Sequence, residues 1–126
     1  MDKKIINTSK APAPIGPYNQ AIISNNIIYI SGQISLNPET NELINTDIAT
    51  ETHQVMRNLH EILTEAGINF NHVVKSTIFL SDMSLFASVN EVYGSYFSAD
   101  YPARETVAVK GLPKNVNVEI SMIAAM

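Results

Sequence analysis

Hydrophobic and polar positions alternate at helical spacing in one long segment of the chain. Between residues 48 and 66, apolar side chains recur every three or four positions, and the intervening positions are polar or charged. This periodicity predicts an amphipathic helix. Thr46 or Asp47 can cap its amino end. Gly67 follows the last apolar residue, where glycine commonly terminates a helix.

A second, shorter helix is predicted over residues 85–97, with Asp82 or Ser84 as its cap. An apolar stripe at helical spacing supports it. The stripe consists of Phe86, Val89, Tyr93, Tyr96 and Phe97. Pro102 lacks an N–H group and biases Tyr101 toward extended backbone, so the helical region has to end before it.

Two patterns predict strands. Residues 19–24 and 27–31 form a predicted hairpin that turns at Asn25 and Asn26, because asparagine tolerates a positive φ. Residues 73–80 and 116–124 also read as strands, as do the β-branched residues after Arg104. Strands 27–31 and 73–80 are apolar on both faces and therefore require cover on both. Prolines rule out regular structure over residues 7–18, and residues 37–41 form a turn between short extended pieces.

The predicted order is β-β-α-β-α-β-β, which is typical of a single α+β domain over residues 1–126 with a mixed or antiparallel sheet. Two amphipathic helices pack on only one face of such a sheet. The other face must be covered by something else, most simply by other copies of the chain. The pattern therefore predicts a closed homo-oligomer.

Composition narrows the function classes. The 126 residues are 45% hydrophobic and 16% charged, with a net charge of −4 and no basic cluster, so nucleic acid is a poor candidate partner. There is no cysteine, which excludes disulfides and thiolate metal sites. His53 and His60 lie seven positions apart with no acidic ligand completing a set, so no metal is expected. No segment has the length of a membrane span, and a cytoplasmic location is the simplest expectation.

Arg104 is the strongest candidate for a functional residue. It follows Pro102 closely and opens a strand, so short, stiff backbone holds it. A guanidinium group in such a place can bind a carboxylate through two parallel hydrogen bonds. The competing interpretation is an ordinary surface or structural ion pair.

Six segments in register resemble the RidA/YjgF family of imine deaminases, from about residue 3 to the carboxyl end. They are IGPYNQA at 15–21, SGQI at 31–34, NPET at 37–40, NEVY at 90–93, PAR at 102–104, and LPK at 112–114 followed by VEI at 118–120. The resemblance implies a chorismate-mutase-like α+β fold and a homotrimer around a barrel of sheets, with ligand clefts between subunits. It also implies hydrolysis of reactive 2-imino acids to 2-keto acids and ammonia, without metal or organic cofactor.

The same resemblance implies roles for particular residues. Arg104 would hold the substrate carboxylate, and Glu119 would orient or activate water. The residues implied to line the cleft are Tyr18, Ser31, Gly32, Asn90 and Thr106.

Each of these positions also has a structural interpretation. Glu119 could be a partner of Arg104, and Tyr18 could be an aromatic plug over the end of the sheet. Asn90 could face solvent from the middle of a helix, and Thr106 could be only a good strand former. Ser31 has a similarly plain structural alternative.

Two positions depart from the family pattern. Several relatives place a cysteine at the position of Thr106, so any role of that thiol is absent here or passes to a hydroxyl. Glu105 stands where a small serine or threonine is usual. Strand alternation directs Glu105 away from Arg104 and Thr106, so we expect an effect at the surface or at an interface.

Three functions remain open at this point. The first is a 2-iminobutanoate/2-iminopropanoate deaminase. The second is a non-catalytic trimer that binds small carboxylic acids or acts in a regulatory or chaperone-like way. A chorismate mutase ranks last, because that chemistry needs several cations and only Lys110 and Lys114 are candidates near Arg104.

Overall fold

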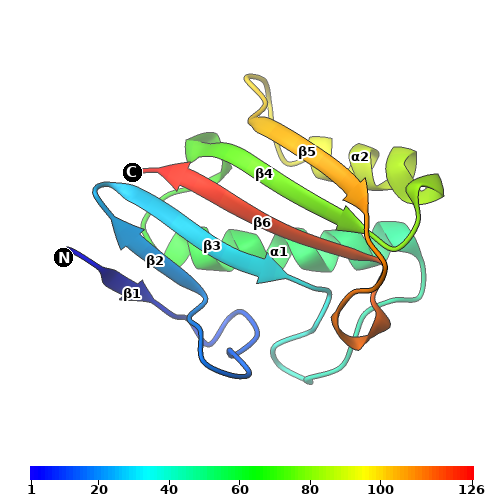
Figure 1. Ribbon diagram of the computed structural model, residues 1–126, viewed down its shortest axis with the longest axis horizontal. Helices are drawn as coiled ribbons and strands as arrows, with labels where there is room; N and C mark the ends of the chain where they lie inside the picture. The colour runs from blue at the N-terminus through cyan, green and yellow to red at the C-terminus, as the bar shows by residue number, and fades with distance from the viewer.

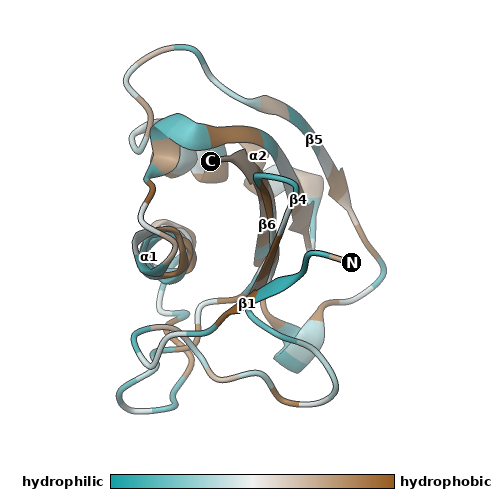
Figure 2. Ribbon diagram, turned by 90° about the vertical axis from the view of Figure 1, so that its left-hand side faces the viewer, coloured by the Kyte–Doolittle hydropathy of each residue, from teal (hydrophilic) through white to brown (hydrophobic).

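A six-stranded sheet with both helices on one of its faces forms the molecule (Figures 1 and 2). The computed structural model describes residues 1–126. The strands are β1 Lys4–Ile6, β2 Ala21–Ser24, β3 Ile27–Gln33, β4 Val73–Leu80, β5 Ala103–Ala108 and β6 Val118–Ala125. The helices are α1 Ile48–Glu65 and α2 Phe86–Gly94. Neither helix has the length and hydropathy that crossing a membrane requires.

The strands lie in the order β1-β2-β3-β6-β4-β5. Neighbouring strands are antiparallel except β4 and β5, which run parallel. A parallel pair needs a crossover connection, and α2 lies within the one between β4 and β5. The sheet is therefore mixed, and β5, which carries Arg104, is its edge strand.

The best-defined predictions are confirmed. Asn25 and Asn26 have φ values of 52° and 62° at the turn between β2 and β3. Asp47 caps α1, accepting a hydrogen bond of 2.8 Å from the Thr50 amide, and Gly67 follows the helix with a φ of 80°. These local signals suffice because each one acts within a few residues.

Four details differ from the predictions. β1 was not predicted, because only three residues form it and they show no alternation. α2 ends at Gly94 rather than at residue 97, although Phe97 still packs into the core beyond the helix. Asp82 caps a 3₁₀ turn just before α2, accepting a hydrogen bond from the Ser84 amide at 2.8 Å. The short strand pair expected in the 33–45 region is a single bridge between Leu36 and Leu43.

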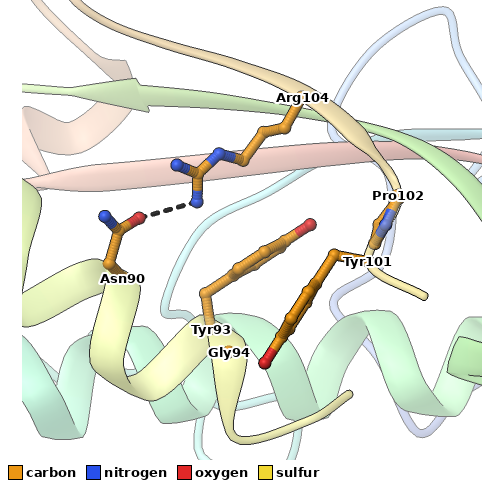
Figure 3. Close-up of a pocket in the computed structure, with 6 residues that line it drawn as sticks. All are labelled: Asn90, Tyr93, Gly94, Tyr101, Pro102 and Arg104. Atoms are coloured by element: carbon orange, nitrogen blue, oxygen red, sulfur yellow. Dashed lines mark hydrogen bonds between the residues drawn. The ribbon is translucent and has the colours of Figure 1, made fainter. Parts of the chain in front are cut away.

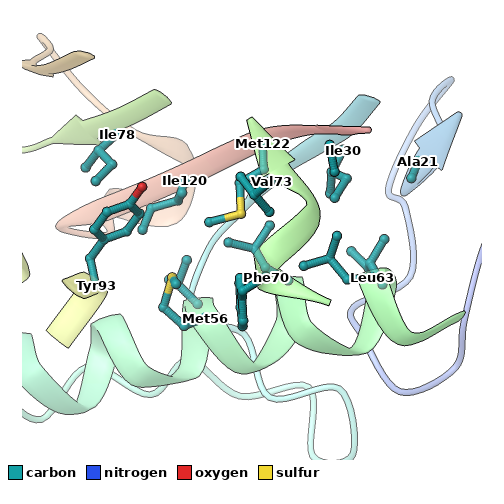
Figure 4. Close-up of a cluster of buried hydrophobic side chains, with 14 of the residues drawn as sticks. Ala21, Ile30, Met56, Leu63, Phe70, Val73, Ile78, Tyr93, Ile120 and Met122 are labelled. Carbon is teal, nitrogen blue, oxygen red and sulfur yellow. The ribbon is translucent and has the colours of Figure 1, made fainter. Parts of the chain in front are cut away.

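The hydrophobic core lies between the sheet and the helices (Figure 4). α1 contributes side chains with no solvent exposure, among them Met56 and Leu63. They pack with inward residues of the sheet, such as Ile78, Ile120 and Met122. Burial of this apolar surface is the main stabilising contribution to the fold.

The opposite side of the sheet carries no helix, and we call it the open face (Figure 2). Alternation places Tyr29, Phe79, Val107 and Ile123 there, and none of the four is fully buried. Glu105 also points to this face, as expected, where it accepts a hydrogen bond from Thr77 and pairs with Lys75 at 3.0 Å. The chain by itself therefore leaves a partly apolar sheet face uncovered.

Candidate functional site

Arg104 lies at the start of β5, at the edge of a cavity of about 480 Å³ (Figure 3). β5 pairs Arg104 with Ser76 of β4, and Ser76 is fully buried toward the helices. The Arg104 side chain therefore extends on the helix side of the sheet, toward α2. The cavity is lined by Asn90, Tyr93, Gly94, Tyr101, Pro102 and Arg104.

The guanidinium of Arg104 is oriented but not neutralised. Its Nη1 donates a hydrogen bond of 2.6 Å to Asn90 Oδ1. Its Cζ lies 5.6 Å from the centre of the Phe86 ring and 5.3 Å from that of Tyr93. The only ion pair in the chain involves other residues, so the ion-pair interpretation of Arg104 is not realised. Its remaining N–H groups are available to an anion.

Asn90 and Thr106 lie on the same side as Arg104. Asn90 is half-buried on α2, and its bond to Arg104 means that it does not simply face solvent. Thr106 pairs with the inward-facing Ile78, and its buried hydroxyl has no hydrogen-bond partner. We call Asn90, Arg104 and Thr106 the Arg104 group.

Tyr93 packs its ring against the Arg104 guanidinium. Its hydroxyl donates to Ser76 Oγ at 2.9 Å, and burial raises the pKa of the Tyr93 phenol. The ring is therefore held in its neutral form against the guanidinium, which favours a cation–π contact.

Glu119 lies on β6 and points to the open face. Its neighbour Ile120 is buried in the core, so alternation turns Glu119 outward. The carboxylate packs over Gly32, where a Cβ atom would stand only 2.9 Å from Glu119 Cδ. Glycine at position 32 is what makes this approach possible. Burial raises the pKa of Glu119.

Tyr18 and Ser31 lie near Gly32, the residue over which Glu119 packs. Tyr18 is half-exposed and lines one cavity of about 400 Å³ with Gly32 and another with Ser31. The Ser31 hydroxyl donates to the Asn19 carbonyl at 2.6 Å, which leaves it an acceptor for a ligand. We call Tyr18, Ser31, Gly32 and Glu119 the Glu119 group.

Within one chain the two groups lie on opposite sides of the sheet. Ile78 of β4 pairs with both Thr106 and Ile120, which fixes Arg104 and Thr106 on the helix side and Glu119 on the other. Arg104 and Glu119 are therefore not partners within a chain, which excludes the structural interpretation of Glu119 as a partner of Arg104 in the same chain.

Sequence reasoning missed several residues of the Arg104 cavity. Tyr93 is interpreted there only as part of an apolar stripe and of the NEVY segment, Tyr101 only as the residue before a proline, and Gly94 not at all. Asn90 and Gly94 are four residues apart on α2 and so share a face. This spacing is the signal that could have identified Gly94 as a lining residue of the cavity. No three His, Asp or Glu side chains are grouped to hold a metal ion.

The fold and the unpaired guanidinium define a small α+β domain with a cationic cavity. The family described as Endoribonuclease L-PSP matches residues 8–126. A 2-iminobutanoate/2-iminopropanoate deaminase of Mus musculus is 48% identical over 122 residues, which cover 97% of this chain and 90% of the mouse protein. The chain belongs to the RidA/YjgF family.

Solved structures agree with this assignment. RidA from the Antarctic bacterium Psychrobacter sp. is 43% identical, with a TM-score of 0.93 and coverage of 98% of this chain and 99% of that one. E. coli TdcF with bound serine is 38% identical, also with a TM-score of 0.93, and 98% of each chain is covered.

Proposed function

We propose that this protein is a 2-iminobutanoate/2-iminopropanoate deaminase that hydrolyses 2-imino acids to 2-keto acids and ammonia in the cytoplasm. The observation that carries the proposal is the guanidinium of Arg104, which is oriented by Asn90 at a cavity and paired with no carboxylate of the chain. A substrate carboxylate is the ligand that such a group binds best.

The relatives support this substrate class. The mouse protein is named for the same two imino acids, and the TdcF structure holds serine, a small amino acid with a free carboxylate. Because these proteins match the chain over nearly its whole length, we assign the binding of a small carboxylic acid to the cavity at Arg104.

A complete site requires two copies of the chain. The Arg104 group and the Glu119 group face opposite sides of the sheet, so Glu119 can meet a ligand on Arg104 only if it comes from another subunit. The partly apolar open face needs cover in the same way. A homotrimer with clefts between subunits satisfies both requirements.

The chemistry needs an anchor and a positioned water. Arg104 holds the carboxylate, which places the electrophilic carbon of the protonated imine beside Glu119 of the neighbouring subunit. Glu119 takes a proton from water as the water oxygen bonds to that carbon. Protonated Glu119 returns this proton to the nitrogen. As the C–N bond breaks, the carbinol O–H gives its proton to Glu119 and the C=O bond of the 2-keto acid forms, and the departing ammonia takes up that proton. Positioning and general-base assistance of this kind contribute roughly two to four orders of magnitude in rate.

The proposal is tested by removing the anchor. An amino-acid dehydratase supplies 2-iminobutanoate, and semicarbazide traps what this protein has not cleared. We expect Arg104→Ala to lower kcat/KM at least about 100-fold, because the carboxylate loses a bidentate partner. Arg57→Ala, on the exposed side of α1, is the matched control and should act like wild type. Equal clearance by wild type and Arg104→Ala would contradict the proposal.

A second candidate is a trimer that binds small carboxylic acids without turnover. The absence of a partner for Arg104 fits either function, because binding requires only the anchor. Calorimetry with 2-ketobutyrate separates the two. Binding by wild type together with equal imine clearance by wild type and Glu119→Gln would favour the non-catalytic function.

A further inference from the structure

Gly94 is a glycine that the fold does not require. It is the last residue of α2, its φ lies outside the left-handed region, and a Cβ atom there would meet nothing within 4 Å. Gly67 has a positive φ, and Gly32 sits under the Glu119 carboxylate. Since glycine weakens a helix relative to alanine, its presence at position 94 calls for another reason.

Its position supplies one, because Gly94 belongs to the wall of the Arg104 cavity (Figure 3). It lies one helical turn after Asn90, whose amide oxygen accepts the hydrogen bond from Arg104. A side chain at position 94 would therefore project from the same helix face as Asn90, into the cavity that Arg104 also lines.

The cavity has two chemically different ends. One end holds the guanidinium of Arg104 and the amide of Asn90. Tyr101 and Pro102 form the other wall, and the Tyr101 ring packs edge-on against Phe97 with 6.2 Å between centroids. A 2-imino acid whose carboxylate is bound to Arg104 can direct its side chain between this wall and the bare backbone of Gly94.

Within one chain, before a neighbouring subunit brings Glu119 to Arg104, this space exceeds what a small substrate needs. About 480 Å³ is in the range of sites for much larger ligands than an imino acid with a one- or two-carbon side chain. The only residue of the lining with no side chain at all is Gly94.

We propose that Gly94 is a specificity-determining residue that leaves room for the side chains of branched and aromatic 2-imino acids. The inference rests on the proposed function in one respect, that Arg104 anchors the substrate carboxylate. It adds that the protein accepts substrates well beyond the smallest imino acids and that position 94 sets the upper limit.

The test compares a small and a large substrate in two variants. A flavin-dependent L-amino-acid oxidase with catalase generates the imines of alanine and phenylalanine, and semicarbazide trapping gives kcat/KM for each. We expect Gly94→Ala to lower the ratio of large to small substrate by about tenfold and Gly94→Leu by more, because added methyl groups in a pocket cost about 10- to 200-fold.

Gly111→Ala is the matched control, because Gly111 also has free space around it and an ordinary φ but lies outside the cavity. Its substrate ratio should equal that of wild type. The melting temperature of Gly94→Ala should be unchanged or about 2–4 °C higher, since alanine favours the helix. An unaltered substrate ratio in Gly94→Ala, or an equal loss on both substrates, would overturn the inference, as would a wild type that clears only the small imine.

A binding measurement separates this inference from the proposed function. Calorimetry with pyruvate and phenylpyruvate gives the same size comparison without turnover. If wild type clears no imine but Gly94→Ala still weakens the binding of phenylpyruvate and not that of pyruvate, the deaminase proposal fails. The proposed effect of Gly94 on ligand size, the size rule, then stands. If neither keto acid binds to wild type, the size rule fails as well.

Discussion

Glu119 shows how the burial that lowers stability at one residue can also serve the chemical role proposed for it. Its carboxylate is packed over Gly32, and loss of water raises its pKa without any compensating cation. A carboxylate with a raised pKa is a better proton acceptor than an exposed one, but its charged form opposes folding. Active-site residues often carry such a cost.

We expect the stability penalty of Glu119 to follow pH. Because the folded pKa lies above the unfolded value, the penalty is absent below the unfolded pKa and fully present above the folded pKa. Glu119→Gln should therefore unfold at higher urea than wild type near neutral pH, and the difference should vanish at acid pH. Urea titrations across this pH range measure the difference in stability. A wild type whose stability increases relative to that of Glu119→Gln as pH rises would contradict the prediction.

Imine clearance by wild type and by Glu119→Gln provides a second measurement. Wild-type imine clearance should fall as pH drops through the raised pKa of Glu119, because the base becomes protonated. Glu119→Gln should be slower by roughly two to four orders of magnitude and lack this acid limb.

At the scale of elements, a buried carboxylate joins a helix to two strands. Glu51 of α1 has no solvent exposure and accepts hydrogen bonds from the Asn117 amide at 2.7 Å and from Asn117 Nδ2 at 3.0 Å. Asn117 in turn accepts from the amide and hydroxyl of Ser81, each at 2.9 Å. These hydrogen bonds among Glu51, Asn117 and Ser81, which we call the joint, hold the start of β6, two residues before Glu119, against the end of β4.

We expect Glu51→Ala to lower the free energy of unfolding by about 2–4 kcal/mol, because it leaves the partly buried Asn117 donors without their acceptor at a site where Glu51 itself is fully buried. Glu51→Gln keeps one acceptor and should lose less. Glu65→Ala, exposed at the end of the same helix, serves as the control and should stay within about 0.5 kcal/mol of wild type. Urea unfolding measures all three. A Glu51→Ala variant as stable as the control would show that the joint contributes nothing.

Element boundaries were predictable where the signals were local. The cap at Asp47, the positive φ at Asn25 and Asn26, and the long period of α1 all depend on near neighbours. β1 was not predictable, because its three residues become a strand only by pairing with β2. The end of α2 moved for a related reason: Phe97 reaches the core without helical backbone.

For the whole molecule, the open face is the feature with the largest consequence. Val107 is 45% exposed there, where it pairs with Phe79 and lies two positions along β5 from Glu105, which forms the ion pair with Lys75. If copies of the chain cover this face, a charge at position 107 would be buried without a partner, which costs several kcal/mol.

We therefore expect Val107→Glu to dissociate the trimer. Sedimentation equilibrium should show wild type as a trimer and the variant as a monomer, and imine clearance should fall with assembly because the proposed cleft is shared by two subunits. Thr64→Glu adds the same charge to the exposed side of α1 and should leave both properties unchanged. A monomeric wild type, or a trimeric Val107→Glu, would remove the basis for a site shared between subunits.

The sequence by itself determined where the two helices and the hairpin form, because periodicity, caps and turns act over a few positions. It also predicted that Glu105 points away from Arg104, since strand alternation is local. Only the tertiary structure decided that Arg104 and Glu119 face opposite sides of one sheet. That outcome depends on the registers of β5 and β6 on β4, which are set by packing between residues far apart in the chain.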